Sequence, residues 1–565
     1  MIKRLWRTIP SNYRGRAAWV VVTIFVRALL NFVGVAMMVP LLVIILDSES
    51  INTIAPLREA YNILGISSYE SFALVMCAVI VGVIVVKNLV VLALYRYERD
   101  YIYGLYSALS KRLFMSYYNQ GLHFIKHNNS ALLTRNVNVV SLMFVAGVLK
   151  PMATILGEVV LLVMLFVALV CYSPTVALFA LVALLPIMAI FYMAVRRRLN
   201  NIGTQENEAQ RTKSRIVAEC FRGYADIEVG GAFSQVLKRF DRAMSEVVTL
   251  RKRSATLSML PQIFTEVGLT VALVVLLIIS LYSSTEDMGL LFGIFAVAAV
   301  RLIPSMRNIL TSWSTLRLNS YSIATMAEAE DYTIPNEEEM ATERLELHHS
   351  VVLDELCFKF EDSDKTIIDH LNMEIRRGER VGIRGASGVG KTTLFNLLLG
   401  LYTPTAGRIL VDGEELNGRR RRMWQNSIGY VSQQVFIADM TLAENIALGV
   451  ESKDIDYKRL NEAIDRADLR SFIESLPKGV ESRIGEQGCR VSGGQRQRIG
   501  IARALYKGCD ILLFDEATSS LDSHTEENIN NAIHHLAKQN NELTIVVIAH
   551  RESSLEYCDR IITLE

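Results

Sequence analysis

Six apolar runs of 22 to 30 residues lie within the first 311 residues of the sequence, and they constrain its fold more than any other feature. A helix needs about 20 mainly apolar residues to cross the hydrocarbon core of a bilayer, and helices in the core of soluble proteins are usually shorter. We therefore predict six membrane-spanning helices rather than the buried helices of a large soluble protein. The predicted spans are 17–46, 72–95, 151–172, 174–195, 260–282 and 290–311.

The connections between these spans predict their orientation, because cytoplasmic loops carry an excess of Lys and Arg. The connections 96–150 and 196–259 hold seven and thirteen basic residues, whereas the connection 47–71 holds only Arg58 against four acids. Both long connections are therefore placed in the cytoplasm, together with the basic N-terminal segment. We expect each to form two antiparallel helical extensions with turns near 122–129 and 220–233. A disordered loop is the alternative.

Ionisable residues lie within the predicted spans, where a Lys or Arg that faces lipid at the helix centre costs at least about 2.5–3.5 kcal/mol. Four bases against two acids favour a cavity that holds an anionic group. Internal ion pairing, or side chains that extend to the membrane surface, is the alternative. The candidate cavity residues are Arg27, Lys87, Glu158, Glu266, Arg301 and Arg307.

Charge divides the chain into two parts. Residues 1–326 contain 31 Lys or Arg and 17 Asp or Glu, whereas residues 327–565 contain 28 and 41. Seven scattered cysteines without C-x-x-C spacing favour a reducing compartment over a disulfide framework or a zinc site. A net charge of +1 gives no sign of a nucleic-acid partner, and the four consecutive arginines at 419–422 are interpreted as a solvated loop.

The second part of the chain contains a phosphate-binding motif. Residues 385–392 fit the pattern G-x-x-x-x-G-K-[ST] between a strand-like and a helix-like run. The glycines let backbone N–H groups approach phosphates at a helix N-terminus. Lys391 would contact the β- and γ-phosphates, and the Thr392 hydroxyl would bind Mg²⁺. The predicted ATP-binding residues here are Gly385, Ala386, Ser387, Gly388, Val389, Gly390, Lys391, Thr392 and Thr393.

Two later strands end in residues suited to phosphate chemistry. The apolar run 511–514 is followed by Asp515 and Glu516. An Asp at a strand end beside a phosphate loop can hold Mg²⁺, and the adjacent Glu can polarise the attacking water. Two acids that merely begin a turn are the alternative. The run 544–549 is followed by His550, which is expected to reach the γ-phosphate, with a structural role as its alternative.

A third segment points to a family. Residues 491–495 read VSGGQ, and Ser-Gly-Gly at the start of a helix presents N–H donors and a hydroxyl to an anion. Together with the phosphate loop and the two acids, the pattern over 350–565 resembles the ABC transporter ATPases. The resemblance implies an α/β P-loop domain that binds ATP and Mg²⁺.

The resemblance also implies roles for individual positions. Phe360 matches the aromatic residue that stacks on adenine, and Gln433 matches the glutamine that touches Mg²⁺ and reports to the membrane domain. Glu486 lies in the segment that exporters place against their membrane arms, and Asp522 matches a loop that crosses to the other subunit. In the family, the signature segment covers ATP that is bound by a second subunit, so a homodimer is expected. The residues of that segment are Ser492, Gly493, Gly494 and Gln495.

The fused order and the long connections resemble exporters. Residues 128–133, 301–305 and 424–429 are similar to the branch that contains lipid-linked oligosaccharide flippases. The resulting fold is an α-helical transmembrane bundle of six long helices at 1–326, a linker at 327–349 and an α/β P-loop ABC ATPase domain at 350–565. We expect a multi-pass protein of the bacterial inner membrane with its ATPase domain in the cytoplasm. The predicted function is ATP-driven export or flipping of an amphipathic lipid-linked glycan or lipid. The alternatives are a peptide or drug exporter and an ATP-gated channel or regulatory membrane protein.

Overall fold

The computed structural model describes residues 6–38, 59, 69–172, 174–282, 288–329, 343–361, 363–485, 491–516, 526–527, 530–531, 534, 542–549 and 551–564. For parts of the helices between residues 172 and 299 it describes the backbone alone. The chain forms two compact units. Met1–Gln120 and Phe124–Ile334 make up the first, and Gly121–His123 and Pro335–Glu565 make up the second.

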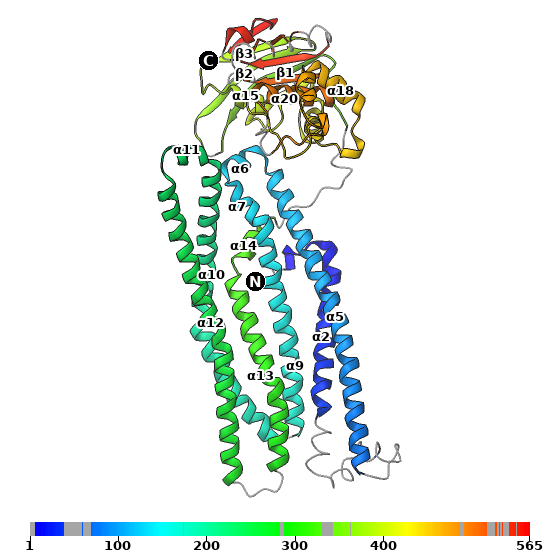
Figure 1. The fold of residues 1–565 in the computed structure, drawn as a ribbon, viewed down its shortest axis with the longest axis vertical. Helices are drawn as coiled ribbons and strands as arrows, with labels where there is room; N and C mark the ends of the chain where they lie inside the picture. Colours follow the sequence, from blue (N-terminus) through cyan, green and yellow to red (C-terminus); the bar gives the residue numbers. More distant parts are fainter. Residues whose placement is uncertain are drawn as a thin grey trace. The chain divides into compact units, whose positions relative to one another are not determined.

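Long helices build the first unit (Figure 1). Two π-helical segments, Asn136–Val140 and Val145–Leu149, lie between the helices that precede the third predicted span. The helices are α2 (Ser11–Ala36), α5 (Tyr69–Asn119), α6 (Gly121–His127), α7 (Ser130–Arg135), α8 (Ser141–Phe144), α9 (Lys150–Tyr172), α10 (Pro174–Arg222), α11 (Tyr224–Val229), α12 (Phe233–Tyr282), α13 (Met288–Leu318) and α14 (Ser322–Ala327).

The predicted spans lie in helices of this unit. Within the described residues, Ser11–Ala36, Ser71–Asn119 and Ser130–Cys171 are long and apolar enough to cross a membrane. The fourth, fifth and sixth predicted spans lie in α10, α12 and α13. Residues 39–46 of the first predicted span lie outside the described residues. The prediction of six long helices is confirmed.

The long connections are helical, so the disordered-loop alternative is wrong. Helices α5, α10 and α12 have 51, 49 and 50 residues and extend far beyond the predicted spans. α10 and α12 run side by side and are joined by a turn that contains α11 (Figure 1). Gly203 lets α10 approach α13 closely, because a Cβ at this position would overlap the carbonyl oxygen of Leu318.

Two sheets and short helices build the second unit, which confirms the predicted α/β class. One sheet is antiparallel, in the order β2-β1-β4-β5, and the other is parallel, in the order β6-β7-β8-β3-β9. The strands are β1 (Ser350–Lys359), β2 (Thr366–Arg376), β3 (Arg380–Gly385), β4 (Ala406–Val411), β5 (Glu414–Glu415), β6 (Ile428–Val431), β7 (Ile511–Asp515), β8 (Thr544–Ile548) and β9 (Arg560–Leu564). The helices of this unit are α15 (Lys391–Leu398), α16 (Gly418–Ser427), α17 (Leu442–Ile446), α18 (Tyr457–Arg466), α19 (Arg470–Glu474) and α20 (Gly493–Lys507).

Helix α16 carries the four consecutive arginines, so the loop predicted for them is wrong. The helix is anchored by Trp424, which is 1% exposed and donates its indole N–H to the carbonyl oxygen of Leu398 at 2.8 Å. Arg419 on the outer side of this helix forms an ion pair of 2.7 Å with Glu343. The arginines suit a surface helix, because their charges reach solvent and Arg has a high helix propensity.

Candidate nucleotide-binding site

The phosphate loop and the two acids lie at the same end of the parallel sheet. β8 pairs with β3 on one side and with β7 on the other, and the register places Ile383, Ile548 and Asp515 in one row. The phosphate loop begins two residues beyond Ile383, at Gly385. Because the carboxyl ends of parallel strands form the ligand-binding edge of such sheets, this alignment brings the predicted phosphate-binding and acidic residues to one edge.

The backbone of the phosphate loop requires glycine. Gly388 and Gly390 have φ values of +84° and +109°, a region that is readily accessible only to glycine. At Gly390 a Cβ would also lie 2.9 Å from the Cγ2 atom of Ile367. Gly390 is followed directly by α15, so the N-terminal N–H groups of this helix open onto the loop.

Lys391 lies beneath the loop. It is 5% exposed, and its ammonium group donates to the carbonyl oxygens of Gly385 at 2.9 Å and Ala386 at 3.0 Å. An ammonium group has three protons to donate, so one more hydrogen bond is available to a ligand. The adjacent Thr392 and the loop residue Ser387 are exposed. The loop therefore combines a fixed positive charge with accessible donors.

Asp515 is held at the end of β7 by a partner that the sequence analysis missed. The carboxylate is 6% exposed and accepts a hydrogen bond of 3.3 Å from the hydroxyl of Tyr430 on β6. Partial burial and the Asp515 carboxylate raise the pKa of Tyr430, so the phenol stays a donor at neutral pH. Tyr430 lies three residues before Gln433, but only the pairing of β6 with β7 reveals its contact.

Glu516 departs from the ordinary strand backbone. Its φ is +48°, while its N–H donates to the carbonyl oxygen of Ile548 at 3.0 Å. Such a conformation costs about 1–3 kcal/mol for a residue other than glycine, and it occurs preferentially at functional sites. The side-chain amide of Gln433 donates to the Glu516 carboxylate at 3.2 Å. The structure thus brings together two of the predicted site residues.

The segment after β6 is tied to α20, which the sequence analysis did not anticipate. Gln497 is 3% exposed and donates to the carbonyl oxygens of Gln433 at 2.8 Å and Ser432 at 3.3 Å. Arg503 donates to the carbonyl oxygen of Phe436 at 2.8 Å, and burial lowers its pKa to about 10. Both residues belong to the helix that follows the signature segment, so this helix and the Gln433 segment are mechanically linked.

The signature segment begins α20, as predicted. The Ser492 hydroxyl accepts a hydrogen bond of 3.2 Å from the N–H of Gln495, and the Gln495 side chain accepts one of 2.9 Å from the N–H of Ser492. This reciprocal arrangement is a capping box. Ser492 and Gly493 are exposed, whereas Gly494 is buried. The helix terminus is therefore preorganised and accessible.

The other predicted residues are placed less completely. Phe360 packs edge-on against Phe358 and Tyr402, with ring centroids 5.0 and 5.6 Å away. His550, Glu486 and Asp522 lie outside the described residues.

The charged residues of the predicted spans show two local pairings. Arg27 forms an ion pair of 3.5 Å with Glu98, both buried, and its guanidinium lies 4.4 Å from the centroid of the Tyr95 ring. Glu158 accepts a hydrogen bond of 2.8 Å from Asn308. Glu98 was missed because it follows the second predicted span. The remaining candidates are Lys87, which lies beside Gly34, Arg301, which is partly buried, and Glu266 and Arg307, which are exposed.

The first unit also contains a cavity of about 650 Å³ that is lined by residues of α7, α8, α10 and α12 and by the end of α13. Three arginines and one glutamate line it, among polar side chains that include Asn138 and Gln210. The glutamate, Glu206, forms an ion pair of 2.8 Å with Arg251. The other two arginines are Arg135 and Arg222.

Comparisons with known proteins agree with this site. A family model described as ABC transporter matches residues 368–519. An ATP-dependent lipid A-core flippase of Cupriavidus metallidurans is 30% identical over 501 residues, which are 86% of this chain and 82% of the relative. A flippase of the same name from Neisseria meningitidis is 30% identical over 391 residues, which are 68% of this chain and 61% of the relative.

A solved structure shares the fold over nearly the whole chain. A bacterial Atm1-family ABC exporter with ATP bound gives a TM-score of 0.78, covering 97% of this chain and 93% of that chain at 21% identity. The helical first unit, the nucleotide-binding sheet and the extended similarity to the Cupriavidus flippase together identify the family. The chain is a membrane protein that belongs to the ABC transporter family, exporter type, in which ATP hydrolysis is coupled to transport.

Proposed function

We propose that this protein is an ATP-driven flippase that moves an anionic, lipid-linked amphipathic molecule across a bacterial inner membrane. The observation that carries the proposal is the contact of Gln433 with Glu516 at the sheet edge where the phosphate loop begins. The chain that holds this site is similar over 501 residues to a lipid A-core flippase. The proposal places the transmembrane domain at 1–326, the linker at 327–349 and the ATPase domain at 350–565.

The phosphate loop supplies the binding energy for ATP in this proposal. The backbone N–H groups of residues 385–393 and the Lys391 ammonium surround the β- and γ-phosphates, because anions bind at helix N-termini. Phe360 stacks on the adenine ring. When ATP binds, Lys391 replaces some of its hydrogen bonds to the loop carbonyls with hydrogen bonds to phosphate oxygens. The Lys391 side chain is therefore the main part of the loop that moves.

The acidic edge fits Mg²⁺. Asp515 offers a buried carboxylate, Thr392 an exposed hydroxyl and Gln433 an amide oxygen, and hard oxygen donors are the ligands that Mg²⁺ takes. We assign these three residues to the ion, which neutralises phosphate charge when bound. The hydroxyl of Tyr430 fixes the Asp515 carboxylate in one orientation.

Glu516 is the proposed catalytic base. Its carboxylate orients a water molecule and accepts its proton as the water attacks the γ-phosphate. The strained backbone and the Gln433 hydrogen bond hold the carboxylate in place before ATP arrives, which reduces the reorganisation that catalysis requires. His550 is proposed to contact the γ-phosphate beside it.

Two copies of the chain are proposed to enclose two ATP molecules. The exposed Ser492 and Gly493 at the start of α20 suit contact with ATP on a facing copy, together with Gly494 and Gln495. We propose that Asp522 contacts the other subunit when the two ATPase domains close. Glu486 is proposed to transmit this movement to the membrane arms. Closure drives transport only because it favours the outward-open state, a population shift by differential binding.

The cavity of the first unit supports an anionic cargo. Arg135, Arg222 and Arg251 give its lining a surplus of positive charge over Glu206. Guanidinium groups bind phosphate and carboxylate oxygens in pairs. Its charged residues lie in the connections 96–150 and 196–259, which are placed in the cytoplasm, so we propose that the cavity attracts anionic groups on the cytoplasmic side of the membrane.

A paired measurement of ATP hydrolysis and lipid movement tests this function. In proteoliposomes, Glu516→Gln should lower ATP hydrolysis by about 100-fold or more, as expected for loss of a general base, while ATP binding is retained. The exposed Glu451→Gln is the matched control and should leave both unchanged. A fluorescent anionic lipid-linked glycan should cross the bilayer only with hydrolysing protein.

Two outcomes would contradict the proposal. Undiminished hydrolysis by Glu516→Gln would remove its catalytic role. Transport of a peptide with no movement of lipid-linked glycans would assign a different cargo.

A further inference from the structure

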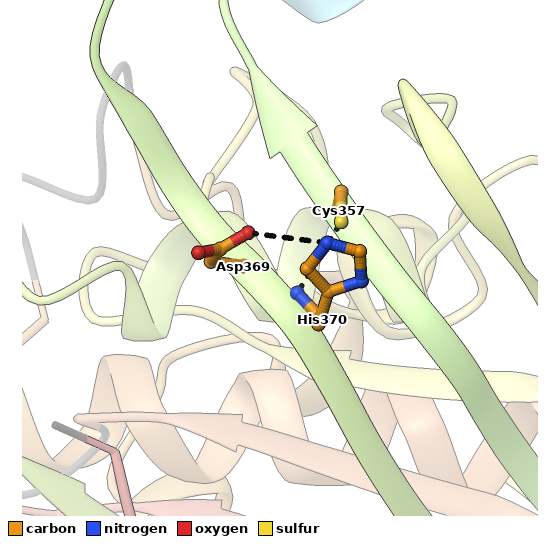
Figure 2. Close-up of side chains that lie close together, drawn as sticks. All are labelled: Cys357, Asp369 and His370. Atoms are coloured by element: carbon orange, nitrogen blue, oxygen red, sulfur yellow. Dashed lines mark hydrogen bonds and ion pairs between the residues drawn. The ribbon is translucent and has the colours of Figure 1, made fainter.

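Three side chains of different chemistry meet on the antiparallel sheet, away from the phosphate loop's own sheet. One ligand-type atom from each of Cys357, Asp369 and His370 lies within 4.8 Å of the other two. Figure 2 shows the Asp369 carboxylate directed at the His370 ring, with Cys357 on the neighbouring strand β1. Cys357 is partly exposed and the other two are exposed, so the cluster is open to solvent.

A β-bulge creates this cluster. The pairs Leu356↔Leu371 and Phe358↔Ile368 flank it, so the single residue Cys357 faces two residues, Asp369 and His370. Neighbours in a regular strand point to opposite faces, but a bulge redirects one of them. His370 has a φ of +45°, which marks it as the redirected residue.

A second bulge restores the register a few residues away. There Glu355, with a φ of +48°, and Asp354 face the single residue Asn372. The two shifts cancel, so the pair Phe358↔Ile368 has the same register as the pair Leu353↔Met373. A third shift follows between Phe358↔Ile368 and Lys359↔Thr366, where Ile367 is the extra residue.

The hydrogen bonds of the imidazole leave one nitrogen for a cation. Nδ1 lies 2.9 Å from an oxygen of Glu355, whose other oxygen accepts a hydrogen bond from Asn372. A carboxylate at this distance favours the proton on Nδ1, which leaves the lone pair on Nε2. Histidine ligands of metals usually donate their second N–H to a carboxylate in this way.

The second imidazole nitrogen lies near the Asp369 carboxylate. Nε2 lies 3.8 Å from Oδ1 of Asp369. In tetrahedral zinc sites, ligand atoms are separated by about 3.3–3.8 Å, given metal–ligand distances of about 2.0–2.3 Å. Small side-chain rotations would bring three atoms that already lie within 4.8 Å to these separations.

We propose that Cys357, Asp369 and His370 bind a thiophilic divalent cation of the Zn²⁺ class, with Glu355 orienting the imidazole from behind. A thiolate, an imidazole and a carboxylate together suit Zn²⁺ and disfavour Mg²⁺ or Ca²⁺, which take oxygen donors. The fourth position is left to water. The bound ion joins β1 to β2 at the bulge. C-x-x-C spacing gave no hint of the site, since its ligands come from two strands.

Metal titration of the full chain without a histidine tag tests the site. Competition with a chromophoric chelator should show one Zn²⁺ per chain that Cys357→Ser and His370→Asn lose. Co²⁺ should give the charge-transfer absorption of a thiolate ligand, which Cys357→Ser abolishes. Glu355→Gln should keep that absorption but weaken binding by about 10- to 100-fold, the usual effect of removing a carboxylate behind a ligand.

Cys558→Ser is the matched control. Burial raises the pKa of the Cys558 thiol to about 11, so it should contribute no thiolate, and its replacement should change neither the stoichiometry nor the spectrum. If a variant fails to fold, the exposed Asp369→Asn provides the same test with a smaller change. Equal Zn²⁺ binding by the unchanged chain and Cys357→Ser, with no thiolate absorption from Co²⁺, would overturn the proposal.

Discussion

Helix α5 and strand β7 are both strongly apolar, but they meet opposite surroundings. In α5, Leu74, Val81 and Leu89 are 71%, 61% and 62% exposed, whereas Leu512 and Leu513 of β7 are fully buried. A continuous apolar surface on a helix of this length is stable when its solvent is lipid. The same residue types therefore specify a lipid-facing surface in one unit and a protein core in the other.

The buried charges of the two units differ in the same way. Arg27 and Glu98 in the first unit neutralise each other, so this pair removes charge from an apolar environment. In the second unit, Lys391 and Asp515 are as buried as Arg27 and Glu98, but they do not pair with each other. Lys391 donates to carbonyl oxygens of the phosphate loop, and Asp515 accepts from Tyr430 on β6. The first arrangement supports the fold, and the second keeps charge ready for a ligand.

The largest expected effect tests whether the core of the second unit depends on tight packing. Trp424→Ala removes a buried ring and leaves a cavity, which lowers the free energy of unfolding by about 3–5 kcal/mol. Urea titration of the full chain in nanodiscs, followed by proteolysis of the ATPase domain, measures this change. Trp19→Ala on α2, where the ring is 65% exposed, is the control and should leave ATPase unfolding unchanged. If Trp424→Ala and Trp19→Ala lowered the free energy of ATPase unfolding equally, the ATPase core would not depend on tight packing around Trp424.

A second prediction tests the lipid-facing side. Val81→Lys near the middle of the second predicted span should oppose membrane insertion by about 2.5–3.5 kcal/mol. The fraction of correctly inserted chain, measured by labelling of single cysteines outside the membrane, should fall for Val81→Lys and stay unchanged for Val81→Leu. Full insertion of both variants would show that this face of α5 packs against protein.

Local sequence patterns were enough to predict the apolar helices of the first unit and the phosphate loop of the second unit. Apolar runs located the helices, and the phosphate-loop motif located a turn in which two of the three glycines of the motif have positive φ values. Each depends on residues close together in the chain. The loop expected at 419–422 is instead part of α16, because consecutive arginines have a high helix propensity as well as a high charge.

Contacts made by strand register and helix packing could not be predicted. Tyr430 meets Asp515 because β6 pairs with β7, and Arg27 meets Glu98 because α2 packs against α5. Both contacts join residues more than 70 positions apart. The bulge at His370 was equally hidden, since one shift in register decides which face its side chain occupies.

The smallest expected effect concerns an exposed ion pair of the second unit. Arg380 binds Asp559 through both guanidinium and backbone N–H groups, with a shortest distance of 2.7 Å. These hydrogen bonds lower the pKa of Asp559. The carboxylate therefore stabilises the fold above its unfolded pKa of about 3.9, and this contribution is lost as the pH falls through the lower folded value.

Because water screens the pair, Asp559→Asn should reduce stability at pH 7 by at most about 1 kcal/mol. The difference from the unchanged chain should shrink as the pH is lowered below about 4, where the carboxyl group becomes protonated in the unfolded state first. Thermal unfolding in nanodiscs across this range measures it, with the exposed Asp364→Asn as control. A difference that grows on acidification would mean that Asp559 is bound more tightly as the acid, which would contradict the pairing with Arg380.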